Sequence, residues 1–310
     1  MLHFIFGGAG CGKSFRLMQE IRSAVAASSD VRTLVPEQFA FTYDGRLYDL
    51  LGAKGFNRVR TGSFRSLTAD LLETAAKHPG DEADTVVKTV VLHRVLHHLV
   101  QANALRYYGR QAQKAAFLDE MSVQLSELMQ SGLSPEQLTD AAAASLGTLS
   151  DKLLDIARIY ADYLDDLSQH GLRDALCDIM TAAAAADSSM YLRGTTVFLD
   201  EFESFTGDEL AMLEVMLRDA EDVWIALRSE NPDQPDFSRF DAVNQTARRL
   251  RRMANDLCIP VECITLTAQH RYADASLAQA VAIFLAISIS PVAAISIGEP
   301  TSVPSCTIPF

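Results

Sequence analysis

The chain has 310 residues, and 48% of them are hydrophobic, enough to bury the core of one large domain or two ordinary ones. Its formal net charge of −13 argues against a protein that binds nucleic acid through its overall charge. No apolar run is long enough to predict a membrane span, and the N-terminus lacks the basic region of a signal peptide. Its five cysteines include no C-x-x-C pair, so we expect reduced thiols in a cytoplasmic protein.

The first segment predicts a site for nucleotide phosphates. His3–Phe6 is a short apolar run typical of a buried strand, and Phe15–Ala27 carries the apolar stripe of a helix. Between them, the P-loop pattern G-x-x-x-x-G-K-[ST] is formed by Gly7, Gly8, Ala9, Gly10, Cys11, Gly12, Lys13 and Ser14. The glycines would let backbone N–H groups wrap the phosphates, Lys13 would reach the β- and γ-phosphates of ATP, and Ser14 would bind Mg²⁺. The alternative is a glycine-rich turn that only joins a strand to a helix.

Two more strands and a long helical block follow. The strands are predicted at Val31–Val35, before Pro-Glu-Gln-Phe, and at Arg58–Ser63, before Phe-Arg-Ser-Leu. From residue 67 to residue 189 no strand-like run occurs, and helical periodicity covers residues 86–104, 111–130 and 149–170. A capping box with Ser134, Pro135 and Gln137 marks the start of a further helix. We therefore expect an all-α insertion over residues 67–189.

The second half of the nucleotide site is predicted at Asp200 and Glu201. They follow the apolar, β-branched run 195–199, which is typical of a central parallel strand that is buried on both faces. Asp200 would hold Mg²⁺ through water at the carboxyl end of that strand, and Glu201 would orient the attacking water. The alternatives are that Asp200 caps the helix near Gly207–Met216, or that both acids are solvated.

Strands at Asp222–Leu227 and Val261–Leu266 complete the pattern. Strands that alternate with helices predict an α/β fold with a parallel sheet, so we expect a P-loop NTPase domain formed by residues 1–66 and 190–285. Residues 286–310 are poor in charge and rich in Ile, Ser and Pro, unlike the rest of the chain. We interpret this tail as a frame-shifted or truncated end and assign no function to it.

The order of these motifs resembles that in the N-terminal part of the AddB/RexB subunit of bacterial ATP-dependent helicase–nucleases. The resemblance rests on the P-loop near residue 1, LVPEQFAF at 34–41, TGSFRSLT at 61–68, the helical insertion, and FLDEFESFTGDEL at 198–210. It covers roughly residues 1–285 and implies a RecA-like domain of the superfamily 1 helicase type. Glu203 stands where those helicases commonly carry Gln, which bears on how the γ-phosphate is coupled to DNA.

The resemblance also implies a setting for the chain. It implies ATP and Mg²⁺ as ligands, a heterodimer with an AddA-type helicase–nuclease subunit, and work in double-strand DNA break repair and recombination, away from any membrane. It implies an iron–sulfur nuclease domain in the C-terminal region of the full-length family, and arginines for hydrolysis on a second motor domain. Neither domain is found in this sequence, so we expect little or no ATPase activity from this chain alone.

The resemblance further implies a DNA path over the loops after the second and third strands, at Gln38, Phe39, Ser63, Phe64 and Arg65. Arg65 has an alternative interpretation as a helix-start residue that is paired with a nearby carboxylate. Two other functions stay open at this point. One is a self-contained P-loop kinase, for which the helical block would be a poor lid, and the other is a scaffold module with a vestigial P-loop.

Overall fold

The computed structural model describes residues 1–27, 29–75, 80–229, 232–233, 240–268 and 270. The 286–310 tail, and with it our interpretation of that tail, lies outside these residues. Six strands build the main sheet: β1 (Leu2–Gly7), β2 (Asp30–Leu34), β3 (Val59–Gly62), β6 (Thr195–Leu199), β7 (Asp222–Leu227) and β8 (Val261–Leu266). All six strands that the sequence predicts are confirmed, with ends that differ by at most two residues.

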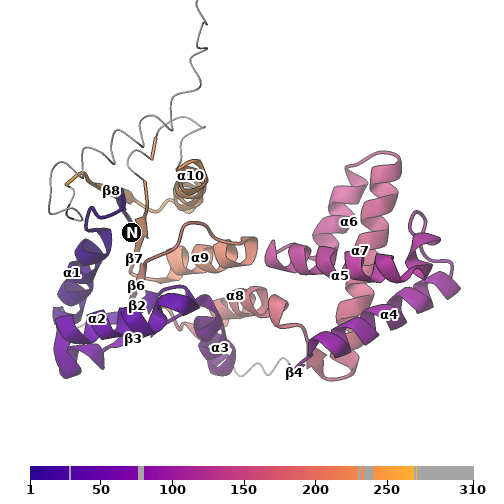
Figure 1. The fold of residues 1–310 in the computed structure, drawn as a ribbon, viewed down its shortest axis with the longest axis horizontal. Coiled ribbons are helices and arrows are strands. Elements are labelled where there is room, and N and C mark those ends of the chain that lie inside the picture. The colour runs from indigo at the N-terminus through magenta and orange to yellow at the C-terminus, as the bar shows by residue number, and fades with distance from the viewer. Residues whose placement is uncertain (28, 76–79, 230–231, 234–239, 269, 271–310) are drawn as a thin grey trace, which may run out of the picture.

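The strands run parallel in the order β3-β2-β6-β7-β1-β8 (Figure 1). The P-loop strand β1 therefore lies between β7 and β8, and β6, which leads to Asp200, lies one strand further away. Parallel neighbours need crossover connections, and helices supply them. All carboxyl ends meet at one edge of the sheet, so the loops after β1, β2, β6 and β7 come together in space.

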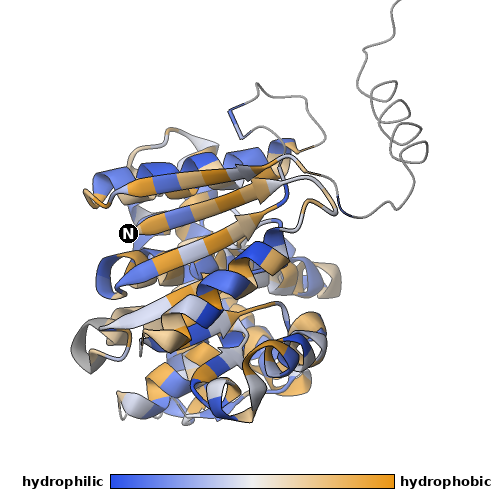
Figure 2. Ribbon diagram, turned by 90° about the vertical axis from the view of Figure 1, so that its left-hand side faces the viewer, coloured by the Kyte–Doolittle hydropathy of each residue, from blue (hydrophilic) through white to orange (hydrophobic). Residues whose placement is uncertain are grey.

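Helices cover both faces of the sheet. On one face lie α1 (Lys13–Ala26) and α2 (Glu37–Phe56), and on the other lie α3 (Phe64–Thr74), α8 (Asp178–Ser189), α9 (Gly207–Asp219) and α10 (Asp241–Asp256). The strands alternate accordingly: Phe4 and Phe6 pack toward α9, whereas Ile5 packs toward α1. Hydrophobic residues recur along the strands and alternate there with more hydrophilic ones (Figure 2). This burial on both faces explains why the central strands β1, β6 and β7 consist mostly of apolar or β-branched residues.

The helical insertion has a hydrophobic core of its own, separate from that of the sheet. Its helices, to the right in Figure 1, are α4 (Thr85–Gln101), α5 (Ala115–Gln130), α6 (Pro135–Ala143) and α7 (Thr148–Gln169), with 3-10 turns at Gln111–Gln113 and Ala175–Cys177. The capping box is confirmed: Ser134 Oγ accepts from the Gln137 backbone N–H, and Gln137 Oε1 accepts from the Ser134 N–H. Leucines of α3 and alanines of α8 pack into the core of the sheet instead. The domain limits at 67 and 189 stay predictions.

Two expectations for this insertion are wrong in detail. It is not all-α, because β4 (Asp81–Glu82) and β5 (Leu172–Arg173) form a parallel pair. Strands of two residues carry no periodicity, so the sequence could not show them. The helix predicted from residue 111 begins only at Ala115, because Lys114 has an extended backbone (φ −98°, ψ 138°) after the 3-10 turn. Within the described part of the chain, no helix is both long and apolar enough to cross a bilayer.

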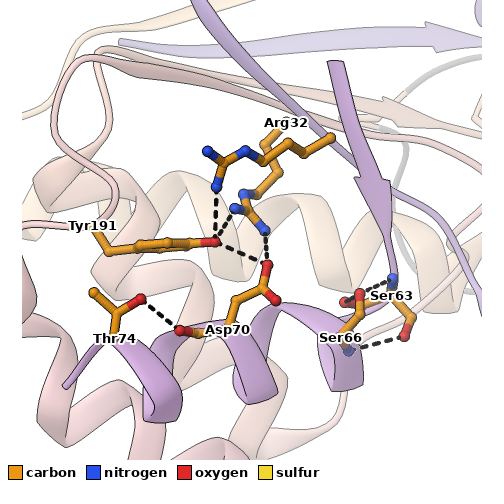
Figure 3. A network of polar contacts seen from close by, with 7 residues as sticks. Arg32, Ser63, Ser66, Asp70, Thr74 and Tyr191 are labelled. Atoms are coloured by element: carbon orange, nitrogen blue, oxygen red, sulfur yellow. Dashed lines mark hydrogen bonds and ion pairs between the residues drawn. The ribbon is translucent and has the colours of Figure 1, made fainter. Parts of the chain in front are cut away.

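A polar network under the sheet holds the segment that leads into β6 (Figure 3). Arg32 of β2 is 6% exposed, and its Nη1 donates to Asp70 Oδ2 on α3 at 3.1 Å. The Tyr191 hydroxyl contacts the Arg32 guanidinium and donates to the same Asp70 oxygen at 2.9 Å. A buried arginine is tolerated because its donors meet a carboxylate and a hydroxyl. The network thereby joins β2 and α3 to the segment that precedes β6.

Candidate functional site

The loop from Gly7 to Lys13 is folded so that the Lys13 side chain contacts the loop backbone. Gly10 (φ 81°) and Gly12 (φ 83°) both adopt the left-handed conformation that favours glycine. A Cβ on Gly7 would lie 3.1 Å from both the Leu266 carbonyl oxygen and Cys11 Cβ, so the close approach of β8 also requires glycine there. Lys13 Nζ donates to the Gly8 carbonyl at 3.0 Å. The strand, loop and helix that the P-loop pattern predicts are thus all present.

The Lys13 ammonium lies in a mixed electrostatic environment. Burial is the main cause that lowers the pKa of Lys13, and the nearby Arg228 cation lowers it as well. The Asp200 and Glu201 carboxylates act in the opposite direction. The charged groups of Asp200, Glu201 and Arg228 act on Lys13 because the strand order places the ends of β6 and β7 close to the end of β1.

Asp200 is 3% exposed at the carboxyl end of β6. Its Oδ1 accepts from the Glu201 backbone N–H at 2.9 Å, whereas its Oδ2 is buried without a hydrogen-bond partner. Burial is the main cause that raises the pKa of Asp200, to about 6, and the neighbouring Glu201 raises it further. A hydrogen bond from Ser14 and the charge of Lys13 lower it in part. One oxygen of this buried carboxylate is therefore hydrogen-bonded to the backbone, and the other is buried without a hydrogen bond.

The alternative interpretations of Asp200 are wrong. The residue that caps α9 is Thr206, whose N–H donates to Glu209 Oε2 at 2.9 Å, so Asp200 has no part in that cap. Its burial also rules out a solvated side chain. Glu201 does have an exposed side chain, and its backbone is left-handed (φ 64°), which is uncommon for a residue with a Cβ. That turn brings the Glu201 N–H back to the Asp200 carboxylate.

A cavity of about 440 Å³ opens at this edge of the sheet. Its lining comes from the ends of four neighbouring elements and consists of Lys13, Ser14, Pro36, Gln38, Phe39, Asp200, Glu201, Phe202, Glu203, Ser204, Ala226 and Arg228. Of the predicted P-loop residues, only Lys13 and Ser14 line this cavity, and they share it with Asp200, Glu201 and two of the predicted DNA contacts, Gln38 and Phe39. This cavity and the P-loop beside it form the candidate site.

The family described as ADDB, N-terminal, matches residues 4–279 of the chain. The chain belongs to the AddB N-terminal family. Among curated relatives, the chain is 30% identical over 273 residues to the B subunit of the ATP-dependent helicase/deoxyribonuclease of Pelotomaculum thermopropionicum, covering 84% of this chain and 23% of that protein. Proteins of the same name from Clostridium acetobutylicum (26% identity over 265 residues; 84% and 23%) and Geobacillus thermodenitrificans (27% over 294 residues; 89% and 25%) are also similar. The chain spans about a quarter of the length of these relatives.

In this AddB family member, the other predicted DNA contacts are not among the residues that line the cavity. Phe64 is 4% exposed and packs edge-to-face on Phe202, with 5.6 Å between the ring centroids, so its ring is not available to a base in this arrangement. Ser63 caps α3, where its Oγ accepts from the Ser66 N–H at 3.4 Å. Arg65 is the second residue of α3, is exposed, and lies 3.9 Å from a Glu82 carboxylate oxygen. These contacts favour the alternative interpretation of Arg65 as a helix-start residue that is paired with a carboxylate.

Sequence reasoning missed two residues of the candidate site, Tyr43 and Arg228. Tyr43 of α2 is 1% exposed, and its hydroxyl is buried without a hydrogen-bond partner. Burial, and after it the Asp200 carboxylate, raises the pKa of Tyr43 well above its usual range. No local signal marks a helical tyrosine as part of a site. Arg228 did carry a signal, because it directly follows the buried strand β7, as Asp200 follows β6.

The residues present fit a nucleotide with Mg²⁺. One oxygen of the buried Asp200 carboxylate has no hydrogen-bond partner, and the Ser14 hydroxyl lies near that carboxylate. The Lys13 ammonium donates a hydrogen bond to the Gly8 carbonyl of the loop. Mg²⁺ is commonly held by one or two carboxylates together with waters and substrate phosphates, so a complete protein cage is not needed. In the described ranges, no group of three or more His, Cys, Asp or Glu side chains could hold a metal without such help.

Proposed function

We propose that this chain is a RecA-like, superfamily 1 helicase-type domain that binds ATP with Mg²⁺. The observation that carries the proposal is the single cavity shared by Lys13, Ser14 and the partner-free carboxylate oxygen of Asp200. The strand order supports it, because β6 and its Asp200 stand one strand away from β1 at the same edge of a parallel sheet. Ligands of open parallel sheets bind at this edge, so Asp200 would be placed to help hold the Mg²⁺ of a nucleotide on the P-loop.

Each residue has a distinct role in the proposal. The backbone N–H groups from Gly8 to Ser14 bind the phosphates at the positive end of α1, and Lys13 exchanges the Gly8 carbonyl for the β- and γ-phosphates. Ser14 donates its hydroxyl oxygen to Mg²⁺, and Asp200 holds a metal-bound water. The exposed Glu201 orients the attacking water when hydrolysis occurs. Bound Mg²⁺ supplies charge neutralisation between the β- and γ-phosphates.

A titration with fluorescent ATP, with and without Mg²⁺, tests this proposal on the 310-residue chain. A lost charge-assisted contact is worth about 1.5–3 kcal/mol, so Lys13→Ala should weaken binding about tenfold to a hundredfold. Lys114→Ala is the matched control, since Lys114 is an exposed lysine of the insertion. Equal affinities of wild type and Lys13→Ala would reject the proposal and favour the scaffold with a vestigial P-loop. If an assay of phosphate release on the same samples detected turnover, the chain would be a self-contained enzyme.

The larger role we propose is that of one segment in a DNA break-repair helicase–nuclease with an AddA-type partner. The family match and the names of the similar proteins support this role. The net charge of −13 opposes DNA binding by the chain alone, and Arg65 is already beside a carboxylate. A gel shift with forked DNA at about 100 mM salt should therefore show weak binding alone and stronger binding with the partner. Tight binding by this chain alone, lost in Arg65→Ala, would contradict the charge argument.

A further inference from the structure

Arg228 occupies the position between the two halves of the candidate site. It directly follows β7, and β7 is hydrogen-bonded to β1 on one side and to β6 on the other. In a parallel sheet the three strand ends lie side by side, so Arg228 stands between the P-loop and Asp200. Its side chain lines the same cavity as Lys13 and Glu201.

The cavity extends beyond the P-loop lysine. Lys13 and Ser14 line it, whereas the loop residues before them are not among its lining residues. A nucleotide whose inner phosphates are wrapped by the loop would therefore point its outermost phosphate into this space. Arg228, Asp200 and Glu201 would meet that phosphate or its bound metal, while the inner phosphates would stay with the loop.

Arg228 forms only a weak ion pair in the candidate site. Its Nη1 lies 3.7 Å from Glu203 Oε1, and the side chains are 52% and 70% exposed. Exposed ion pairs of this kind contribute little, so an incoming phosphate can displace the carboxylate at small cost. A guanidinium can bind a phosphate through two parallel N–H groups, which Lys13 cannot do. Glu203 is therefore suited to hold Arg228 near the site without binding it firmly.

We infer that Arg228 is a ligand, supplied by this chain, of the terminal phosphate of a nucleoside triphosphate, and that binding draws it away from Glu203. The inference rests on the proposed function and makes it more specific. Arg228 would let the site distinguish a nucleoside triphosphate from a diphosphate. Glu203 would be the partner of Arg228 when no nucleotide is bound. Binding of a triphosphate would then break the Arg228–Glu203 ion pair and so change the contacts of the 201–206 loop.

The test compares the dissociation constants of Mg²⁺-ATP and Mg²⁺-ADP for wild type, Arg228→Ala and Glu203→Gln. Arg228→Ala should weaken ATP binding about tenfold to a hundredfold and change ADP binding by less than about twofold. Glu203→Gln should tighten ATP binding about twofold to fivefold, because the competing carboxylate is gone. Arg106→Ala is the matched control, since Arg106 is an exposed arginine of the insertion that pairs with Asp151 at 3.6 Å. Urea unfolding of each variant shows whether it is folded, and Arg228→Lys serves if Arg228→Ala is not.

The outcomes separate this inference from the proposed function. No nucleotide binding by wild type would overturn both. Binding that is lost in Lys13→Ala but has an unchanged ratio of ATP to ADP affinity in Arg228→Ala would overturn only the role of Arg228. Equal losses of ATP and ADP affinity in Arg228→Ala would also overturn it, because the arginine would then support the loop and not the terminal phosphate. Weaker ATP binding in Glu203→Gln would overturn the exchange of partners.

Discussion

Replacing Asp200 with Asn should stabilise the ligand-free chain at neutral pH and at the same time weaken its binding of Mg²⁺-ATP. The carboxylate is 3% exposed, and one of its oxygens has no partner, so the ionised form is costly in the folded state. Asn has nearly the same shape and no charge, so it removes that cost. A gain in stability together with a loss of ligand binding is typical of residues that are kept for function.

The magnitude follows from the pKa of Asp200, which burial raises from 3.8 to about 6. A tenfold change in proton affinity corresponds to about 1.4 kcal/mol, so ionised Asp200 lowers the free energy of unfolding by about 3 kcal/mol at pH 7. Because the pKa in the folded state lies above the unfolded value, the loss is absent below pH 3.8 and develops as the pH rises toward 6. Asp200→Asn should therefore match wild type near pH 3.8 and exceed it increasingly up to pH 6–7.

Urea unfolding at several pH values between 4 and 7 measures this difference. The matched control is Asp119→Asn, an exposed aspartate on α5, which changes the net charge equally and should leave the pH dependence as in wild type. The mechanism would be refuted if Asp200→Asn and wild type had the same stability at pH 7. A stability difference that stayed constant across the whole pH range would refute it as well.

Two further predictions concern the parts of the fold that hold the site and the insertion together. Asp155→Ala should lower the free energy of unfolding by about 3–5 kcal/mol, because the buried carboxylate accepts backbone N–H groups of residues 106–108 at 2.8–2.9 Å. Urea unfolding measures this loss. The control Asp151→Ala, which breaks only an exposed ion pair on the same helix, should cost less than about 1 kcal/mol. Similar losses in both variants would contradict a special stabilising role for Asp155. Tyr191→Phe should cost about 1–2 kcal/mol in thermal or urea unfolding, because Arg32 and Asp70 lose a shared hydroxyl; a neutral effect would show that water replaces it.

Local sequence signals predicted the six strands of the main sheet and several residues of the candidate site. The P-loop could be located because its glycines must stand at fixed places between a strand and a helix, and Gly10 and Gly12 do have positive φ angles. Asp200 could be proposed as part of the candidate site because it ends a buried apolar run in a chain that also carries the P-loop pattern. Capping by Ser134 could be predicted because it depends on residues only three positions apart.

The tertiary structure alone decided which strands are neighbours and which side chains are buried. Tyr43 and Arg228 belong to the site only because α2 packs beside β6 and because β7 lies between β1 and β6. Phe64 stands next to a predicted DNA loop in the sequence, yet it packs on Phe202 from a segment 138 positions away. Hydrophobic periodicity shows which face of a helix or strand is apolar, but it does not show which other element packs on that face. Strand order and burial depend on contacts between distant parts of the chain, so they appear only once the chain is folded.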